Sequence, residues 1–404
     1  MANNNENKVL NVPHLRFPEF SGEWEKNNLS KFSSKITKKN KGNFINNVLC
    51  NSANLGIIPQ NDYFDRDIAN ADNTDSYYII EQGDFVYNPR KSTAAPYGPV
   101  NIYNGEKPGI ISPLYLCFSV FNISPSFLFY RFKSSVWHPY VYSHGDTGVR
   151  YDRVSIKDDV FFDMPIYTPT QNEQEKIATL LFLIDERIAT QNKIIEDLKK
   201  LKSAIVEMLL CNQNGESFKL RDVGCFVRGL TYANEDVTEN KAATTVIRAN
   251  NLNYGNNVDK DEVVYVNKTP TASQILRKGD IVICMANGSS SLVGKNSYYP
   301  FNDGQSTIGA FCGIYRTSYP FVKWLMQSQR YKRLVYQSLQ GGNGAIANLN
   351  GDDILNMSFP LIEKEKSQSI IFAIDAIEKS LMVNKSLQRL YYTQKSYLLK
   401  QMFI

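Results

Sequence analysis

The stretch that decides the fold runs from Pro169 to Cys211 and reads PTQNEQEKIATLLFLIDERIATQNKIIEDLKKLKSAIVEMLLC. Apolar residues recur in it at alternating intervals of four and three residues, which is the heptad pattern of a coiled-coil seam. The seam consists of Ile177, Leu181, Ile184, Ile188, Ile195 and Leu198, with polar Gln191 in the same series. After Leu198 we expect it to shift phase and to continue through Leu201, Ile205 and Met208. A helix of about 40 residues would be about 60 Å long.

A second seam of the same kind closes the chain. It consists of Ile370, Ile374, Ile377, Leu381, polar Asn384, Tyr391, Leu398 and Met402. One polar residue near the middle of a seam is a known means of setting the register of a coiled coil. Two unrelated amphipathic helices, each packed on its own domain, are the alternative. Both segments are longer than an ordinary globular helix, which favours two paired helices.

Each long segment follows a globular region, and the two regions repeat one another at low identity. Three features recur in the same order: a Gly-Asp turn before a buried strand, a proline that starts an amphipathic segment, and a strand that contains proline. They are Gly83-Asp84 and Gly279-Asp280, Ser124-Pro125 and Tyr319-Pro320, and Met164-Pro165 and Phe359-Pro360. A shared order of features is the signature of an internal repeat.

The repeat predicts an α+β protein in which two pseudo-repeated α/β domains are separated by two long antiparallel coiled-coil helices. The boundaries are an N-terminal tail over 1–19, a first domain over 20–166, a central helix over 167–211, a second domain over 217–360 and a C-terminal helix over 361–404. Residues 1–8 are expected to be disordered.

Composition bounds the possible functions of the 404 residues. The chain carries 45 basic and 40 acidic residues, a net charge of +5, which permits a polyanionic partner without requiring one. No apolar stretch approaches about 18 residues, so we expect no membrane helix. The N-terminus lacks a signal-peptide pattern, which predicts a cytoplasmic protein. Three histidines and six scattered cysteines without a CxxC pair make a metal site unexpected.

Motifs for catalysis are absent or incomplete. The stretch Tyr87-Asn88-Pro89-Arg90 lacks the second proline and the aromatic residue of an amine-methylating loop. The stretch from Gly288 to Asn296 has one residue too many for a phosphate-binding loop, and asparagine replaces its magnesium-binding hydroxyl. No G-x-S-x-G motif supports acyl transfer. We therefore predict no catalytic residue, and a self-contained methyltransferase or nuclease is disfavoured.

Two similar domains joined by paired helices suit a long ligand with two half-sites. DNA is the natural candidate, because half-site spacing on a duplex is geometric. Asparagine can bond adenine, arginine can bond guanine, and basic loops can contact phosphates. The candidate DNA-contacting residues are Asn54, Arg90, Lys91, Arg248, Asn250, Asn251, Lys295, Arg330, Lys332 and Arg333. A solvated surface is the alternative for each.

The helix seams are the second candidate site. The residues predicted to pair the helices or to dock other subunits are Ile177, Leu181, Ile184, Ile188, Ile374 and Leu381. A scaffold that gathers proteins on a coiled coil without contacting DNA is the alternative function. Phosphate neutralisation makes true DNA binding salt-dependent, so the salt dependence of binding would distinguish the two.

Three segments resemble a known family. The opening segment Val12–Trp24, VPHLRFPEFSGEW, resembles the start of specificity subunits of type I restriction–modification systems, and Thr170–Ile188 resembles their central conserved helix. The stretch Gly279–Lys295 is similar to their target-recognition domains. In the C-terminal helix, Ser367-Gln368-Ser369 departs from the Gln-Lys-Ile-Ala typical of the family.

The resemblance implies a non-catalytic specificity subunit of a DNA adenine methyltransferase and restriction endonuclease complex. It implies two target-recognition domains, each reading one half of a bipartite double-stranded DNA target, with helices that set the spacer. It also implies two modification subunits, which bind S-adenosylmethionine and methylate adenine, and two restriction subunits, which use ATP and Mg. No cofactor is expected in this chain.

Overall fold

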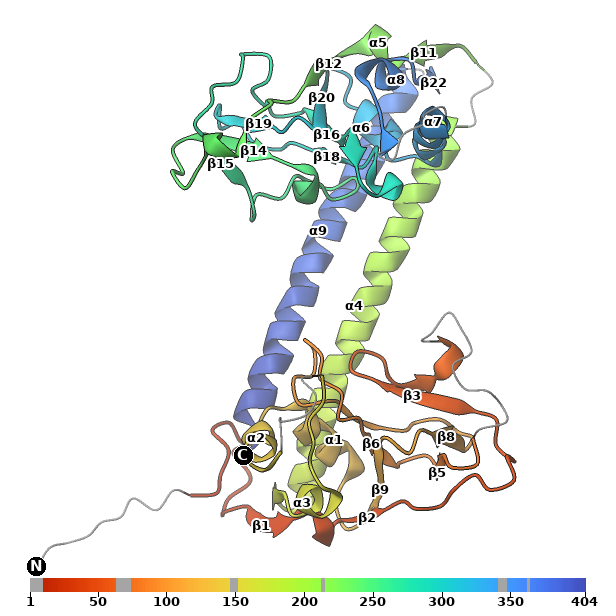
Figure 1. The fold of residues 1–404 in the computed structure, drawn as a ribbon, viewed down its shortest axis with the longest axis vertical. Helices are drawn as coiled ribbons and strands as arrows, with labels where there is room; N and C mark the ends of the chain where they lie inside the picture. The colour runs from red at the N-terminus through yellow and green to blue at the C-terminus, as the bar shows by residue number, and fades with distance from the viewer. Residues whose placement is uncertain (1–9, 63–73, 146–151, 212–214, 341–346, 362–363) are drawn as a thin grey trace, which may run out of the picture. The chain divides into compact units, whose positions relative to one another are not determined.

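The computed structural model describes residues 10–62, 74–145, 152–211, 215–340, 347–361 and 364–404. The chain divides into two compact units: unit 1 comprises Met1–Asn192 and Ser386–Ile404, and unit 2 comprises Lys193–Lys385. Two long helices, α4 (Gln171–Cys211) and α9 (Lys364–Gln401), run through the fold (Figure 1). Each unit therefore contains a part of both helices.

Unit 1 is built on two four-stranded sheets in its described part. One sheet has the order β2-β9-β6-β7, the other has the order β4-β3-β8-β5, and β1 pairs with β10 in a separate ladder. The strands are β1 (Glu25–Asn28), β2 (Ser33–Lys35), β3 (Val48–Ser52), β4 (Gly56–Pro59), β5 (Tyr78–Ile80), β6 (Phe85–Tyr87), β7 (Val100–Ile102), β8 (Gly109–Ile111), β9 (Leu116–Val120) and β10 (Pro165–Thr168). The helical segments are η1 (Leu29–Lys31), η2 (Gln60–Asp62), α1 (Pro125–Lys133), α2 (His138–His144) and α3 (Asp158–Phe162).

Unit 2 repeats this plan. Its described sheets have the orders β12-β20-β16-β18 and β13-β15-β14-β19, with two-stranded ladders β11-β22 and β17-β21. The strands are β11 (Ser217–Lys219), β12 (Gly224–Arg228), β13 (Val237–Thr238), β14 (Thr244–Ile247), β15 (Val264–Val266), β16 (Ile281–Cys284), β17 (Ala286–Asn287), β18 (Asn296–Tyr298), β19 (Ser306–Ile308), β20 (Cys312–Thr317), β21 (Ala347–Asn348) and β22 (Ser358–Pro360). The helical segments are α5 (Leu220–Val223), η4 (Asn234–Asp236), η5 (Ala249–Asn251), η6 (Ser290–Leu292), α6 (Val322–Leu325), α7 (Gln329–Gln340) and α8 (Gly351–Leu355).

The shared topology confirms the predicted α+β fold with two pseudo-repeated domains. In both units one sheet is wholly antiparallel, and the other contains a single parallel pair, β3 with β8 or β14 with β19. The units differ at a sheet edge, because β5 extends the second sheet of unit 1 beyond β8, whereas β13 extends that of unit 2 beyond β15. The domain limits predicted from the sequence stay predictions.

The Gly-Asp turns behave as predicted. Gly83 and Gly279 have φ angles of +93° and +104°, which glycine adopts without steric cost at the third position of a type II turn. In each turn the aspartate carboxylate accepts the N–H three residues earlier: Asp84 from Glu81 at 2.7 Å, and Asp280 from Arg277 at 2.8 Å. The strands β6 and β16 begin directly after these turns.

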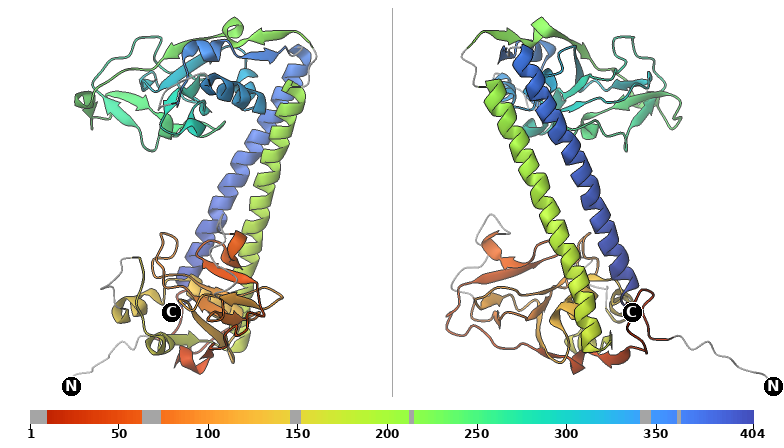
Figure 2. Two further views of the ribbon diagram at one scale, coloured as in Figure 1. Left: turned by 45° about the vertical axis from the view of Figure 1, so that its right-hand side comes forward. Right: turned by 180° about the vertical axis from the view of Figure 1, so that it is seen from behind.

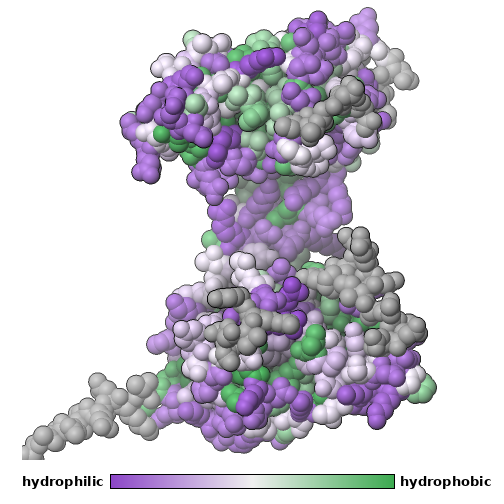
Figure 3. Space-filling model, in the orientation of Figure 1, coloured by the Kyte–Doolittle hydropathy of each residue, from purple (hydrophilic) through white to green (hydrophobic). Residues whose placement is uncertain are grey.

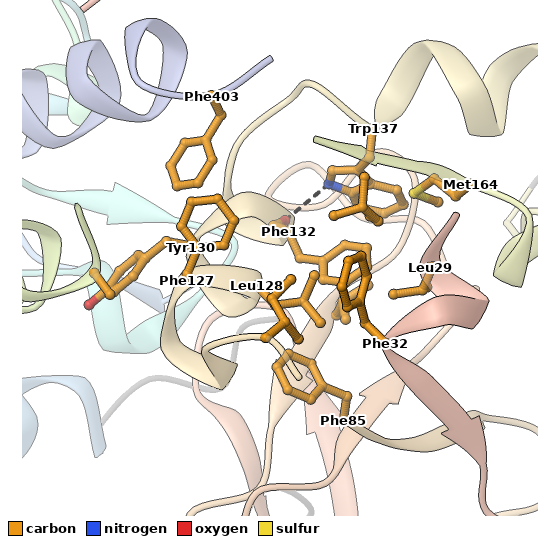
Figure 4. Close-up of a cluster of buried hydrophobic side chains, with 14 of the residues drawn as sticks. Leu29, Phe32, Phe85, Phe127, Leu128, Tyr130, Phe132, Trp137, Met164 and Phe403 are labelled. Atoms are coloured by element: carbon orange, nitrogen blue, oxygen red, sulfur yellow. Dashed lines mark hydrogen bonds between the residues drawn. The ribbon is translucent and has the colours of Figure 1, made fainter. Parts of the chain in front are cut away.

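Aromatic side chains form the core of unit 1. Phe127 and Leu128 of α1, Phe85 of β6 and Trp137 are buried together, and the Trp137 indole donates to the Phe132 carbonyl at 3.1 Å (Figure 4). Phe403 lies against Phe127, with 5.4 Å between the ring centroids. The last residues of the chain are thus part of the same core as β6 and α1.

The helix start at Pro125 is confirmed and the one at Pro320 is corrected. Pro125 begins α1, and the Ser124 hydroxyl caps it by accepting the Phe127 N–H. Beyond Pro320, however, the chain forms two short helices, α6 and α7, joined by a turn. The Ser328 hydroxyl accepts the Tyr331 N–H at the start of α7, which explains why a second helix begins there.

Within each unit the segments of α4 and α9 run antiparallel. In unit 1, Ile177, Leu181, Ile184 and Ile188 are buried in one cluster with Leu398 and Met402, and Lys395 pairs with Asp185. In unit 2, Val206 is buried with Ile370 and Ile374, and Leu381 is also buried. Both views of Figure 2 show the end of α9 beside the start of α4 in unit 1.

The predicted phase shift after Leu198 is wrong. Leu201 and Met208 are exposed, whereas Val206 is buried. The original spacing of four and three residues continues from Leu198 to Lys202, whose side chain is mostly buried. The charge on Lys202 hides this seam position from a search for apolar residues.

Candidate nucleic-acid interface

The N-terminal segment is fixed to the start of α4. Residues 10–19, assigned from the sequence to a tail, include Arg16. Its guanidinium forms a bidentate ion pair with Glu173, in which Nε donates to Oε1 and Nη2 donates to Oε2, each at 2.7 Å. The Glu173 carboxylate is fully buried, and the Trp24 indole also donates to it at 3.4 Å. The hydrogen bond from Arg16 to Glu173 raises the pKa of Arg16. The opening segment and the central-helix segment, two of the three that carry the family resemblance, therefore meet at this ion pair.

Two equivalent ion pairs join α4 to α9. In unit 1, Lys395 of α9 contacts Asp185 of α4 at 2.5 Å, and the Tyr130 hydroxyl donates to the same carboxylate at 3.0 Å. In unit 2, Lys202 of α4 contacts Glu378 of α9 at 2.5 Å. The same shift in residue number carries Asp185 to Glu378 and Lys202 to Lys395. The repeat thus preserves the pair while exchanging which helix supplies the cation.

A surface hollow of about 930 Å³ lies beside Lys395 in unit 1. We call it the unit-1 hollow. Its lining comes from the β3–β4 hairpin, β7 and the following loop, α1 and α9. It consists of Asn47, Leu49, Ala53, Asn54, Leu55, Gly56, Ile57, Pro59, Asn101, Ile102, Tyr103, Asn104, Gly105, Phe129, Lys133, Tyr392 and Lys395. Four asparagines and two lysines face one concave surface.

A chain of hydrogen-bonded, buried amides holds the Lys133 ammonium in this hollow. Its ammonium donates to the Asn101 side-chain oxygen, and the Asn101 amide nitrogen donates to the side chain of Asn51 at 2.6 Å. The Asn51 amide nitrogen in turn donates to the carbonyls of Val86 at 2.7 Å and Pro99 at 3.3 Å. Burial, with a contribution from Lys395, lowers the pKa of Lys133 to about 8, and Asp185 opposes the shift.

Unit 2 has two adjoining hollows of about 610 and 600 Å³, which we call together the unit-2 hollow. Their lysines are Lys199, Lys202, Lys323, Lys332, Lys379 and Lys385, their carboxylates are Asp375 and Glu378, and their asparagines are Asn253, Asn256 and Asn257. Burial lowers the pKa of Lys202, although the hydrogen bond to Glu378 opposes this. Cations outnumber carboxylates in this lining, which favours an anionic ligand.

The two hollows occupy equivalent places. Each contains the lysine of the repeated helix ion pair, Lys395 in one and Lys202 in the other. The lining of the unit-2 hollow also includes Tyr254, whose ring lies 6.0 Å from the Lys332 ammonium. Figure 3 shows mainly hydrophilic residues over the visible surface of α4 and α9.

Two of the predicted DNA-contacting residues line these hollows. They are Asn54 in unit 1 and Lys332 in unit 2, and both are exposed. Arg90 is exposed on another part of unit 1, with 4.0 Å between its Nε and Asp152, and the Lys91 N–H donates to the Asp152 carbonyl. In unit 2, Arg248, Asn250 and Arg333 are exposed and Lys295 is half-buried, and none of these four lines a hollow described above.

The structure uses two predicted contacts internally. Asn251 is buried, and its side chain accepts the Arg248 N–H at 2.9 Å and donates to the Glu262 carbonyl at 3.3 Å. It holds the turn η5, and a contact between Asn251 and DNA stays a prediction. Arg330 donates its Nε to the Ser358 carbonyl at 2.9 Å and thereby connects α7 to β22.

Sequence reasoning missed Lys133, Lys202 and Lys395. Continuing each heptad through charged positions would have found Lys202 and Lys395, because both occupy seam positions. No local signal identifies Lys133, since its neighbours Asn101 and Lys395 are distant in sequence. Among the described residues, no group of three His, Cys, Asp or Glu side chains could hold a metal ion, and no helix is long and apolar enough to cross a membrane.

No protein-family model matches the chain. It is similar in sequence to the specificity subunits of two type I restriction enzymes, EcoKI from Escherichia coli (strain K12) and StySPI from Salmonella potsdam. Each is 30% identical over 153 residues, which are 36% of this chain and 32% of the relative. The match thus spans about a third of the length of these relatives.

Solved structures extend the comparison to the whole fold. The S subunit of a type I restriction–modification system from M. genitalium matches with a TM-score of 0.57 and 15% identity, over 97% of this chain and 99% of that chain. The chain has the fold of a type I specificity subunit. A chain from a study of the assembly and conformational transition of the type I system matches this specificity-subunit fold with a TM-score of 0.58 and 12% identity, over 95% of this chain and 98% of that chain. The resemblance seen in the sequence is confirmed.

Proposed function

We propose that this chain is the DNA-specificity subunit of a type I restriction–modification complex. Each unit reads one half of a bipartite double-stranded target. The observation that carries this proposal is the repeated hollow, lined by asparagines and lysines and placed beside Lys395 in unit 1 and Lys202 in unit 2. The similarity in fold and sequence to specificity subunits supports the same function.

The chemistry of the two linings suits a duplex. Lysine ammonium groups neutralise phosphates and fix the protein on the duplex, but they carry no sequence information. Asparagine amides present a donor and an acceptor together, which matches the edge of adenine in the major groove. Asn54 in unit 1 and Asn253 and Asn256 in unit 2 are exposed and line the hollows, so they are our candidates for reading bases.

The chain itself is proposed to be non-catalytic. The chemistry then belongs to partners: two modification subunits that use S-adenosylmethionine, and two restriction subunits that use ATP and Mg. The cytoplasm, where such a complex would meet DNA, stays the expected location.

Docking of the partners is assigned to residues next to the seam. Ile177, Leu181 and Ile184 are buried against the chain itself, so these positions pair the helices and leave no surface for another subunit. Phe182 and Leu183 of α4 and Phe372 of α9 are exposed apolar residues on the same helices. Apolar side chains of this size on an exposed face suit a protein interface, and we assign subunit docking to them.

Methylome sequencing tests the proposed function. Cells that carry this chain together with a type I modification subunit that assembles with it are compared with cells that lack the chain. We expect a new split motif, in which two short half-sites with methyladenine flank a fixed spacer. A complex that assembles but produces no new motif would contradict the proposal. Salt-insensitive binding to DNA would then favour the scaffold alternative.

A further inference from the structure

Lys133 is a mostly buried cation without a carboxylate partner among the described residues. It is the last residue of α1, and its ammonium donates to the Asn101 side-chain oxygen and lies 5.0 Å from the Phe129 ring centroid. An ammonium has three N–H donors. The described protein groups supply one hydrogen-bond acceptor, so two donors remain for a ligand in the unit-1 hollow.

The amide chain holds this acceptor in one orientation. The Asn101 nitrogen donates to the Asn51 side-chain oxygen at 2.6 Å and to the Ser52 carbonyl at 3.0 Å. Both bonds require the nitrogen on that side, so the Asn101 oxygen must face Lys133. Buried and fully bonded amides keep a single arrangement, and the ammonium is therefore held in place before any ligand arrives.

The charges around Lys133 leave a local excess of positive charge. Lys395 of α9 also lines the hollow, and Asp185 of α4 is the carboxylate that both lysines interact with. Among the described residues, the other titratable groups of this lining and ion pair are the phenols of Tyr103, Tyr130 and Tyr392. Two ammonium groups thus share one carboxylate, and one added negative charge would balance the group.

We propose that Lys133 and Lys395 bind a phosphate group in the unit-1 hollow. A phosphate oxygen can accept the two free Lys133 donors, and its charge balances the lysine pair. This inference rests on the proposed function, because it assigns the phosphate to the backbone of bound DNA. Asn54 lines the same hollow, so a backbone held by Lys133 would bring base edges within reach of that asparagine.

The Lys133 position differs between the two units. Aligning Pro125 with Pro320 places Ser328 of unit 2 at the position of Lys133, and the Ser328 hydroxyl is used to cap α7. Unit 2 retains Lys202 at the position of Lys395, and Glu378 pairs with it as Asp185 pairs with Lys395, so Lys133 is the residue that distinguishes unit 1. A signal from the titration of Lys133 would therefore report on one half-site.

Proton uptake on binding is the test. Burial beside Lys395 holds the pKa of Lys133 at about 8, and a phosphate would raise that pKa again. Binding then takes up about half a proton at about pH 8. Titration calorimetry of the full chain with a random-sequence DNA duplex, in buffers of different ionisation enthalpy, measures this uptake. Affinity should be highest below about pH 8 and fall by up to about tenfold per pH unit above it.

Substitutions test whether Lys133 is the residue that takes up the proton on binding. K133R keeps the charge at every accessible pH, so it should bind DNA without the uptake. K133M should lose both the uptake and affinity, whereas K41M, which removes an exposed charge outside the hollow, should keep the uptake.

Salt-dependent DNA binding by the wild type without proton uptake overturns the phosphate site and leaves the proposed function standing. If the wild type does not bind the duplex at all, the proposed function itself is overturned. Uptake with inorganic phosphate but not with the duplex overturns the assignment to DNA and makes the free ion the ligand.

Discussion

Replacing Phe403 with alanine tests whether the end of the chain belongs to the core of unit 1. Phe403 is buried, and its ring lies 5.4 Å from that of Phe127, a residue of α1 far away in sequence. Truncating a buried phenylalanine to alanine removes its apolar contacts and leaves a cavity, at a cost of about 3–5 kcal/mol. For a unit of this size each kcal/mol lowers the melting temperature by about 2–4 °C. We therefore expect the transition of unit 1 to fall by roughly 6–20 °C.

Differential scanning calorimetry measures this loss, and hydrogen exchange locates it. Amides of β6 and α1 should exchange faster in the variant, while those of β16 and β20 in unit 2 should keep their protection. F372A is the matched control, because Phe372 lies in α9 as a phenylalanine that is 78% exposed and should change stability by less than about 0.5 kcal/mol. A loss below about 1 kcal/mol for F403A, or a loss of protection confined to unit 2, would refute the assignment of the chain end to unit 1.

Four further experiments test other inferences from the structure. R16M should cost about 3–5 kcal/mol in denaturant unfolding, because it leaves the buried Glu173 carboxylate without its cation, and an unchanged midpoint would contradict this. G83A and G279A should each cost about 1–2 kcal/mol, since φ is positive and an added Cβ would meet nothing within 4 Å; clearly unequal losses would argue against equivalent turns. E378Q should lower the free energy of unfolding by about 1 kcal/mol, because it leaves the mostly buried Lys202 without its carboxylate. Melting curves identical to wild type would show that this ion pair does not stabilise the fold. Exchanging residues 217–360 for the corresponding segment of another specificity subunit should change one half of the methylated motif, and a change in both halves would refute separate reading.

Local patterns in the sequence predicted much of the fold. The Gly-Asp turns were predictable because glycine at positive φ and an aspartate that bonds three residues back are local requirements. The seams were predictable where every position is apolar, as from Ile177 to Ile188. They became unpredictable at Lys202, where a buried ion pair with a residue of the other helix replaces an apolar contact.

The site was less predictable than the fold. Its asparagines and lysines come together through contacts between segments far apart in sequence, such as Lys133 with Asn101 and Lys395 with Asp185. Composition predicted the right residue types but not which of them line a hollow. Asn251 is an example, because its side chain accepts the Arg248 N–H within a turn and is buried there.

The way each globular segment joins the helices fits the proposal that each segment reads one half-site separately. Residues 217–360 begin and end in the ladder β11–β22, where Ser217 is paired with Pro360. In unit 1 the ladder β1–β10 pairs Glu25 with Thr168 in the same way. The two ends of each segment are therefore adjacent, which is the geometry that lets one compact element be exchanged without moving the chain around it. The helices cannot be divided in this way, because the core of unit 1 needs Phe403 and Leu398 as well as Ile177. If the proposed function holds, recognition can vary within each ladder-bounded segment, whereas the core of each unit needs residues of both α4 and α9.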